Sequence, residues 1–306
     1  MDNKNLRNIW PAMIETAHAL GAHYRPAMER TAQQHGLAPA EYGVLLVALM
    51  FAPHPVAVWN LRLRGPYTSA GRYDERLRQA ARLGYFRVPH EGEYRLTDLG
   101  QRTARRLLDA ASRAMSRLAP VPGAESHRLA ELLHRLVAAS AAAPEPPGTR
   151  NLSLSRRLDP GEKANVIVRL DQSLSDLNAF RDDSHLAAWQ PCGLNAIAWE
   201  ALTFAWRGEA RTPDELFARL PNRGHSRDDY AQALADLAAR GLAKADSGTY
   251  ALTRKGQALR QKAEEQTDQY FYAPWKVLSE GEVDELSSLL QQLRGGLAPP
   301  VKTSRT

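Results

Sequence analysis

The chain has 306 residues, of which 43% are hydrophobic and 24% are charged, with a net charge of +6. This length allows two domains, and no apolar run of 18 residues indicates a membrane-spanning helix. The single cysteine, Cys192, excludes an intrachain disulfide and a multi-cysteine metal cluster. Motifs of nucleotide-binding, hydrolase and metalloprotease sites are missing, so the sequence predicts no enzyme and no cofactor. The N-terminal residues do not resemble a secretion signal, which predicts a cytoplasmic protein.

A pair of helices is predicted in the first half of the chain. Residues 56–63 form the shorter helix, and Tyr73, Leu77 and Ala81 mark the apolar face of a longer one. Gly84 ends this second helix, because glycine adopts the left-handed conformation without a Cβ clash.

Two extended runs follow, over residues 85–88 and 93–96, with turn-forming residues between them, so they predict a hairpin. Thr97 is expected to cap a new helix. Long helices are predicted at about 97–118 and 124–140. The order of elements is that of a winged helix-turn-helix.

The same block returns in the second half, 157 residues later through the helices and 156 residues later through the hairpin. A period this long is the length of a domain and predicts two tandem domains. The second copy comprises a helix over 213–220 capped by Thr212, the residues Tyr230, Leu234, Ala238 and Gly241, a hairpin over 242–244 and 249–252, a cap at Thr253, and helices at about 253–272 and 279–295.

These positions divide the chain into four parts. Residues 5–140 and 162–297 are the two predicted repeats. Residues 141–161 form a linker that is rich in Pro and Ala, and prolines favour an extended spacer. The part of it from Arg150 to Gly161 is expected to be irregular, and the tail 298–306 is expected to be disordered.

The chain resembles the MarR family of bacterial regulators in its helix stops, its hairpins and its Leu-Thr-x-x-Gly segments. The resemblance extends upstream, where His23-Tyr24-Arg25 before Gly36-Leu37 is echoed by Ala179-Phe180-Arg181 before Gly193-Leu194. It implies a mainly α (α+β) fold of two tandem winged helix-turn-helix domains, whose long helices form a dimer-like interface between the repeats. It also implies a DNA-binding transcription regulator with a small-molecule pocket. Members of the family are homodimers, so this chain would be a pseudo-dimer that is monomeric or pairs again.

Positive charge is concentrated in the two predicted DNA-reading segments. Residues 59–106 hold 11 Arg and 5 acidic residues, for a charge of +6, and residues 206–262 hold 11 Lys or Arg and 7 acidic residues, for +4. The remainder is then 6 − 10 = −4. Such patches favour phosphate binding through counterion release. The alternative is that these arginines are only solvated surface.

The residues expected to contact DNA lie at the starts of the two longer helices and in the hairpins. They are Thr68, Ser69, Arg72, Arg76, Arg87 and Arg95 in the first repeat, and His225, Ser226, Arg227, Lys244 and Arg254 in the second. The second helix is ambiguous, because Asp228 and Asp229 repel phosphates but suit a helix N-terminus. The second repeat therefore either binds DNA weakly or serves as a scaffold.

The resemblance implies a small-molecule pocket between the helices that hold the dimer together and the DNA-reading lobe. Asp182 and His185 lie on one helix face and could share a metal, although a salt link between them is the commoner arrangement. The aromatic run Tyr270, Phe271, Tyr272 and Trp275 is expected to pack between the repeats. The ligand-binding residues predicted on this basis are His18, His23, Tyr24, Phe180, Arg181, His185 and Trp189.

Two other functions compete with DNA binding. Tandem winged helices also serve as sensors or protein-interaction modules, and Asp228-Asp229 with Gly71 would suit a protein that has lost DNA reading. An enzyme built on the run Arg181-Asp182-Asp183-x-His185 is a weaker alternative. It would need a pocket that gathers more acidic or histidine side chains around His185.

Overall fold

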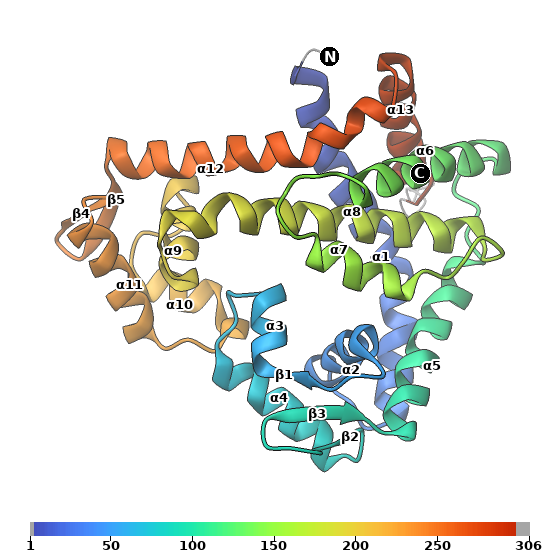
Figure 1. The fold of residues 1–306 in the computed structure, drawn as a ribbon, viewed down its shortest axis with the longest axis horizontal. Helices are drawn as coiled ribbons and strands as arrows, with labels where there is room; N and C mark the ends of the chain where they lie inside the picture. Colours follow the sequence, from blue (N-terminus) through green and yellow to red (C-terminus); the bar gives the residue numbers. More distant parts are fainter. Residues whose placement is uncertain (1–2, 298–306) are drawn as a thin grey trace, which may run out of the picture.

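The computed structural model describes residues 3–297. The protein is mainly helical, as the sequence predicts, with two small lobes attached to a helical body (Figure 1). The body lies along the top and right of that view, and the lobes lie at the bottom and left. Within residues 3–297, no helix has both the length and the apolar character needed to cross a membrane. The predicted disordered tail, residues 298–306, lies outside the described residues.

The body is built from the longest helices of the chain, which come from both of its halves. They are α1 (Asn3–Gln34), α5 (Asp98–Met115), α6 (Gly123–Ala141), α7 (Arg150–Ser155), α8 (Val166–Trp189), α12 (Arg254–Tyr272) and α13 (Glu280–Leu297), with the 3-10 turns η1 (Arg156–Leu158), η2 (Gln190–Cys192) and η4 (Ala273–Val277).

The first lobe contains three helices and a three-stranded antiparallel sheet in the order β1-β3-β2. The helix predicted from Val56 starts instead at Val58. The reason is that Val56 and Ala57 pair with β3, which buries Val56 completely. The elements of this lobe are α2 (Pro39–Phe51), β1 (Val56–Ala57), α3 (Val58–Arg64), α4 (Ala70–Arg82), β2 (Phe86–Arg87) and β3 (Glu93–Leu96).

The second lobe has the same order of helices and hairpin, with a two-stranded sheet. Thr212 caps its second helix by accepting a hydrogen bond from the Glu215 N–H at 3.2 Å, and Pro213 occupies the first turn, as predicted. Its elements are α9 (Ala196–Arg207), α10 (Pro213–Arg219), η3 (Pro221–Arg223), α11 (Arg227–Ala239), β4 (Ala243–Asp246) and β5 (Thr249–Leu252).

Identical junctions join each hairpin to the helix that follows it. The Thr97 hydroxyl donates to the Gly84 carbonyl at 2.8 Å and accepts the Gly100 N–H at 3.1 Å, which caps α5. The equivalent bonds of Thr253 measure 2.7 and 3.2 Å and cap α12. In each case the threonine side chain connects the glycine that ends one helix to the first turn of the next helix, which gives a physical reason for its place in both copies of the block.

The segment that links the two halves is more ordered than its composition predicts. The expectation that residues 150–161 are irregular is wrong for residues 150–158, because α7 and η1 form there and α7 packs on α8. Asp183 holds its start, since its carboxylate accepts the backbone N–H groups of Asn151 and Leu152, both at 2.9 Å. The prediction rested on the prolines of this segment, and the capping carboxylate comes from a helix about 30 residues away, which local composition does not reveal.

The two halves of the chain cross in the body. Helix α6 packs along α8, and α1 packs along α13, so each contact joins one half to the other. One continuous apolar core runs through the body and the first lobe. Phe271 is fully buried in it, with its ring centroid 5.1 Å from that of Trp10. The prediction that the aromatic run packs against the other half of the chain is confirmed for this residue.

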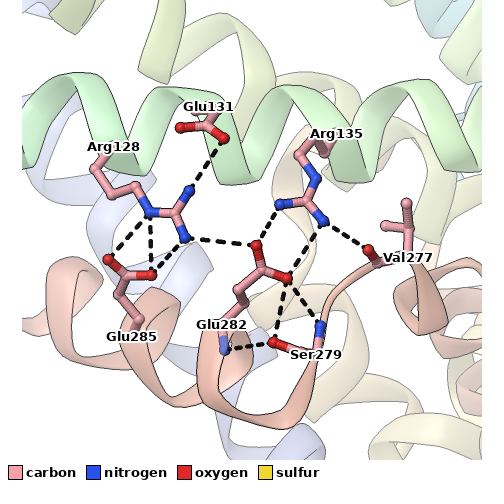
Figure 2. A network of polar contacts seen from close by, with 7 residues as sticks. All are labelled: Arg128, Glu131, Arg135, Val277, Ser279, Glu282 and Glu285. Atoms are coloured by element: carbon pink, nitrogen blue, oxygen red, sulfur yellow. Dashed lines mark hydrogen bonds and ion pairs between the residues drawn. The ribbon is translucent and has the colours of Figure 1, made fainter.

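Charged side chains bridge the same crossing on its solvent side (Figure 2). Arg128 on α6 binds Glu285 on α13 at 2.8 Å, and Glu282 bonds to Arg135 as well as to Arg128. Hydrogen bonds from Arg135 and from the Ser279 backbone hold the pKa of Glu282 at about 2. Glu282 is therefore ionised at neutral pH, and its ion pairs connect α6 with α13.

Replacement of Gly100 by alanine is expected to destabilise the fold by roughly 2 kcal/mol or more, as overpacking does. A Cβ at this position would overlap the Tyr85 carbonyl oxygen, and backbone cannot rotate away. Gly43→Ala in α2 is the matched control, because a Cβ there meets nothing within 4 Å. Gly43→Ala should stabilise the folded protein by about 0.5–1 kcal/mol. Urea unfolding of both variants measures the difference, and equal effects would contradict this account of Gly100.

Candidate nucleic-acid interface

The start of α4 is capped within its own lobe. The Ser69 side chain accepts the Arg72 N–H at 3.1 Å, which makes Ser69 the N-cap. Thr68 is buried, with 6% of its surface exposed. Arg72 is half-buried and pairs with Glu75 one turn later at 2.7 Å. Of the residues predicted to read DNA here, Thr68 is therefore covered and Ser69 has a structural role.

The start of α11 is stabilised by a reciprocal cap. The Ser226 hydroxyl accepts the Asp229 N–H at 3.1 Å, while the Asp229 carboxylate accepts the Ser226 N–H at 2.7 Å. These bonds lower the pKa of Asp229. Arg227 is exposed and pairs with Asp214 on α10 at 2.6 Å. Asp229 thus serves the helix terminus, which is one of the two roles the sequence left open.

The two lobes touch at the turns that precede these helices. We call residues 65–69 the first connector and residues 220–226 the second connector. The Ser69 N–H donates to the Arg223 carbonyl at 2.8 Å, and His225 donates from Nε2 to the Tyr67 carbonyl at 2.9 Å. Arg76 reaches across to donate to the Asn222 carbonyl at 3.1 Å. Backbone groups of both connectors are therefore used in holding the lobes together.

Tyr67 is the centre of this contact. Its hydroxyl lies 3.0 Å from Nε2 of His185, its ring lies 6.0 Å from that of Trp189, and the Arg223 guanidinium sits 5.4 Å from its ring centroid. The side chain thus packs against the core of the opposite lobe. Sequence reasoning missed Tyr67, since its partners are more than a hundred residues away.

This contact brings the two helix starts close together. Ser69 is bonded to Arg223, and Arg227 follows only four residues later. Because four residues span at most about 14 Å, Ser69 and the start of α11 lie within about 20 Å of each other. Two recognition helices that occupy successive major grooves need roughly 34 Å. In this arrangement the two helices cannot both enter one face of a duplex.

The hairpins keep their basic residues outside this contact. Arg87, Lys244 and Arg254 are exposed, and Arg95 is half-buried. Exposed arginine and lysine on a hairpin tip or its flanking helix can reach phosphates or a minor groove. These four residues are therefore accessible to solvent, and their contact with the DNA backbone stays a prediction.

A cavity of about 790 Å³ lies where α1, α5 and α8 meet the first lobe. His18, Tyr24 and Arg25 line it from α1, and Asp171 lines it from α8. Burial raises the pKa of Tyr24 to about 12, so its phenol stays protonated. Two of the predicted ligand residues, His18 and Tyr24, are therefore brought together beside a space large enough for a small molecule.

A second cavity, of about 550 Å³, lies between the second lobe and the body, and Tyr67 forms part of its wall. Arg181 and His185, both predicted, line it. Arg181 pairs with Glu264 at 3.0 Å. Arg260 has only 2% of its side chain exposed and binds the same carboxylate at 2.8 Å. The wall is thus a network of paired buried charges, which is costly to disturb because removing one partner leaves the other uncompensated.

The remaining predicted ligand residues line neither of these cavities. His23 makes a hydrogen bond of 2.9 Å to the Leu297 carbonyl, while Phe180 and Trp189 are buried in the apolar cores.

His185, in the wall of the second cavity, bonds to Tyr67 and accepts the Trp199 indole N–H at 3.4 Å. Burial, helped by Arg260, lowers the pKa of His185 to about 4, so it is neutral. Over residues 3–297, no three His, Cys, Asp or Glu side chains are grouped to hold a metal ion.

Asp171 makes the stability of the protein depend on pH. Burial beside the first cavity raises the pKa of its carboxyl to about 7, although Arg25 opposes this shift. In the unfolded chain the carboxyl titrates near its ordinary value of about 4. The folded state then binds more protons than the unfolded state between about pH 4 and pH 7, so stability falls as the pH rises through this window.

Asp171→Asn is therefore expected to stabilise the protein at pH 8 by up to about 4 kcal/mol, because raising the pKa of the carboxyl from about 4 to about 7 costs about 1.4 kcal/mol for each pH unit. The gain should shrink as the pH falls towards 4 and vanish below about pH 3, where the Asp171 carboxyl is protonated in both states. Thermal unfolding at pH 4.5 and pH 8 measures it. Asp109→Asn, at an exposed position lining the same cavity, is the control. A gain of equal size at both pH values would disprove the role of burial.

The model of a helix-turn-helix family matches residues 95–299, which is more than half of the chain. The match contains the whole second lobe and the body helices from α5 onward. The first lobe, up to β3, lies almost entirely outside it. No curated protein and no solved structure matches the chain.

Proposed function

We propose, from the premise that this chain belongs to a helix-turn-helix family, that it is a DNA-binding transcription regulator with two DNA-reading lobes. The observation that carries the proposal is the family match across α10 and α11, which form the helix-turn-helix of the second lobe. The first lobe has the same element order, and residues 59–106, which add the start of α5 to its helix-turn-helix and hairpin, carry a charge of +6. The equivalent segment of the second half, residues 206–262, includes the start of α12 and carries +4. Both segments would therefore attract the phosphate backbone.

The two halves act as the protomers of a fused, MarR-like dimer in this proposal. In a twofold dimer the two protomers present the same surface to each other. Helix α6 is the second helix after the first hairpin, and α13 is the second helix after the second hairpin. Arg128 on α6 binds Glu285 on α13. In a homodimer both helices would carry the same side chains, whereas a single chain allows one to be basic and the other acidic where they meet.

The first cavity is the site we assign to a small-molecule effector. Its walls come from the body and from the first lobe, including Arg64 on α3 and Met50 on α2. A ligand that contacts both would bind best in one orientation of the lobe, and it would shift the population towards that orientation. Effector binding would in this way change the spacing of the two recognition helices.

One observation favours the alternative of an interaction module that does not bind DNA. The starts of α4 and α11 are held together through the connectors, so the surface that should enter a groove is occupied. In such a protein the contact would be permanent and the positive charge would only keep the surface solvated. DNA binding decides between the two functions.

Selection of bound fragments from a sheared genomic library should recover specific duplexes, and binding should weaken steeply between 50 and 200 mM salt. Arg87→Ala removes one exposed hairpin cation and is expected to reduce affinity for the duplex about 5- to 10-fold. The slope of the logarithm of affinity against the logarithm of salt concentration should become smaller by about one. Arg113→Ala, an equally exposed arginine on α5 in the body, should leave the affinity unchanged. Electrophoretic mobility shifts at both salt concentrations provide the measurement.

Failure to enrich any fragment at either salt concentration would reject the proposal in favour of the interaction module. Equal losses in Arg87→Ala and Arg113→Ala would show that the affinity comes from the overall charge and not from the hairpin.

A further inference from the structure

We propose that the contact between the two connectors is an autoinhibitory latch, in which Tyr67 holds the lobes closed and withholds the start of α4 from DNA. The inference rests on the proposed DNA-binding function and adds a mode of regulation to it. Opening the latch would require no ligand contact with the DNA-reading surface itself.

The latch uses the atoms that DNA would need. Arg76, which was predicted to contact DNA, donates instead to the Asn222 carbonyl, and the second-lobe candidate His225 donates to the Tyr67 carbonyl. Thr68, which belongs to the first connector, is buried. Helix starts less than about 20 Å apart also cannot reach two successive major grooves. Closure thus blocks the predicted contacts and gives the wrong spacing for a duplex.

The second lobe is built to move as a unit. It has its own apolar core, formed around Trp199, Leu216 and Leu234 and separate from the core that joins the body to the first lobe. Helices α8 and α12 pass from the body to this lobe as two stems (Figure 1). Tyr67 is the first-lobe side chain that packs on the edge of the second core. Bending of the two stems would separate the lobes without exposing either core.

Gly224 permits the close approach of the connectors. Its φ of +72° is in the left-handed region, and a Cβ there would come within 2.6 Å of Arg72 Cβ and 2.8 Å of Ser69 Oγ. A side chain at position 224 is therefore incompatible with the closed contact. Asparagine tolerates a left-handed backbone better than other non-glycine residues do, so it can test closure with little cost to the local fold.

The experiment compares Gly224→Asn with Gly193→Asn in the full chain. Gly193 has a φ of +70°, and a Cβ there meets nothing within 4 Å, so it controls for backbone strain. The first measurement is deuterium exchange of the Ser69 amide, which donates to Arg223 across the contact. The second is affinity for a random-sequence 40-base-pair duplex at 50 mM salt. Both measurements are repeated with Tyr67→Ala, a substitution that leaves the backbone of both connectors unchanged.

Gly224→Asn and Tyr67→Ala are expected to exchange the Ser69 amide at least tenfold faster and to bind the duplex at least fivefold tighter than the parent, while Gly193→Asn matches the parent. In the Gly224→Asn background, Arg72→Ala should lose that gain.

Unchanged exchange at Ser69 would overturn the latch. Faster exchange without tighter binding, in a parent that does bind the duplex, would overturn autoinhibition alone. Faster exchange with no duplex binding by any variant would reject both autoinhibition and the proposed function.

Discussion

The crossing of the two halves in the helical body is the constraint on which the rest of the structure depends. Because α6 packs on α8 and α1 packs on α13, neither half can bury its long helices without the other. The apolar core that results holds the body together, and the ion pair of Arg128 with Glu285 fixes the alignment of α6 and α13 (Figure 2). The first lobe lies in the chain between α1 and α5, and the second lobe lies between the two stems α8 and α12.

The contact between the connectors gives the molecule a second, weaker level of organisation. It consists of a few hydrogen bonds and the packing of Tyr67, each of which contributes only modestly to stability because the same groups bond to water when the contact opens. A contact of this kind can be populated in the free protein and still yield to a duplex that offers many phosphate interactions. The body is thus the permanent part of the structure, and the connector contact is the part suited to regulation.

Local features of the fold were predictable from the sequence, because they depend on neighbouring residues. The helix stop at Gly84, the cap at Thr97 and the hairpin between them follow from turn chemistry and periodicity, and the same holds for the second copy. The predictions failed where a distant partner decides the structure. The strand at Val56 exists because β3 is available for pairing, and α7 exists because Asp183 caps it.

The candidate site was predictable to a lesser extent. Charge and helix position identified Arg72 and Arg76, but nothing near them in the sequence indicates that Asn222 and Arg223 lie against this helix start. Tyr67 and Gly224 carry no local signal for the same reason. The predicted ligand residues were also placed by partners that the sequence does not reveal. Tyr24 and Arg181 line two separate cavities. Phe180, which is the counterpart of Tyr24 in the second half, is buried in the core.

The most direct test is the distance between α4 and α11 in the otherwise unmutated protein, measured by pulsed electron paramagnetic resonance. Spin labels at the exposed positions Arg82 and Ala235, in a Cys192→Ser background, report this distance with and without bound duplex. We expect one short, narrow distribution in the free protein and a shift to longer distances when the duplex binds. The same distribution in both samples, with the duplex demonstrably bound, would contradict it.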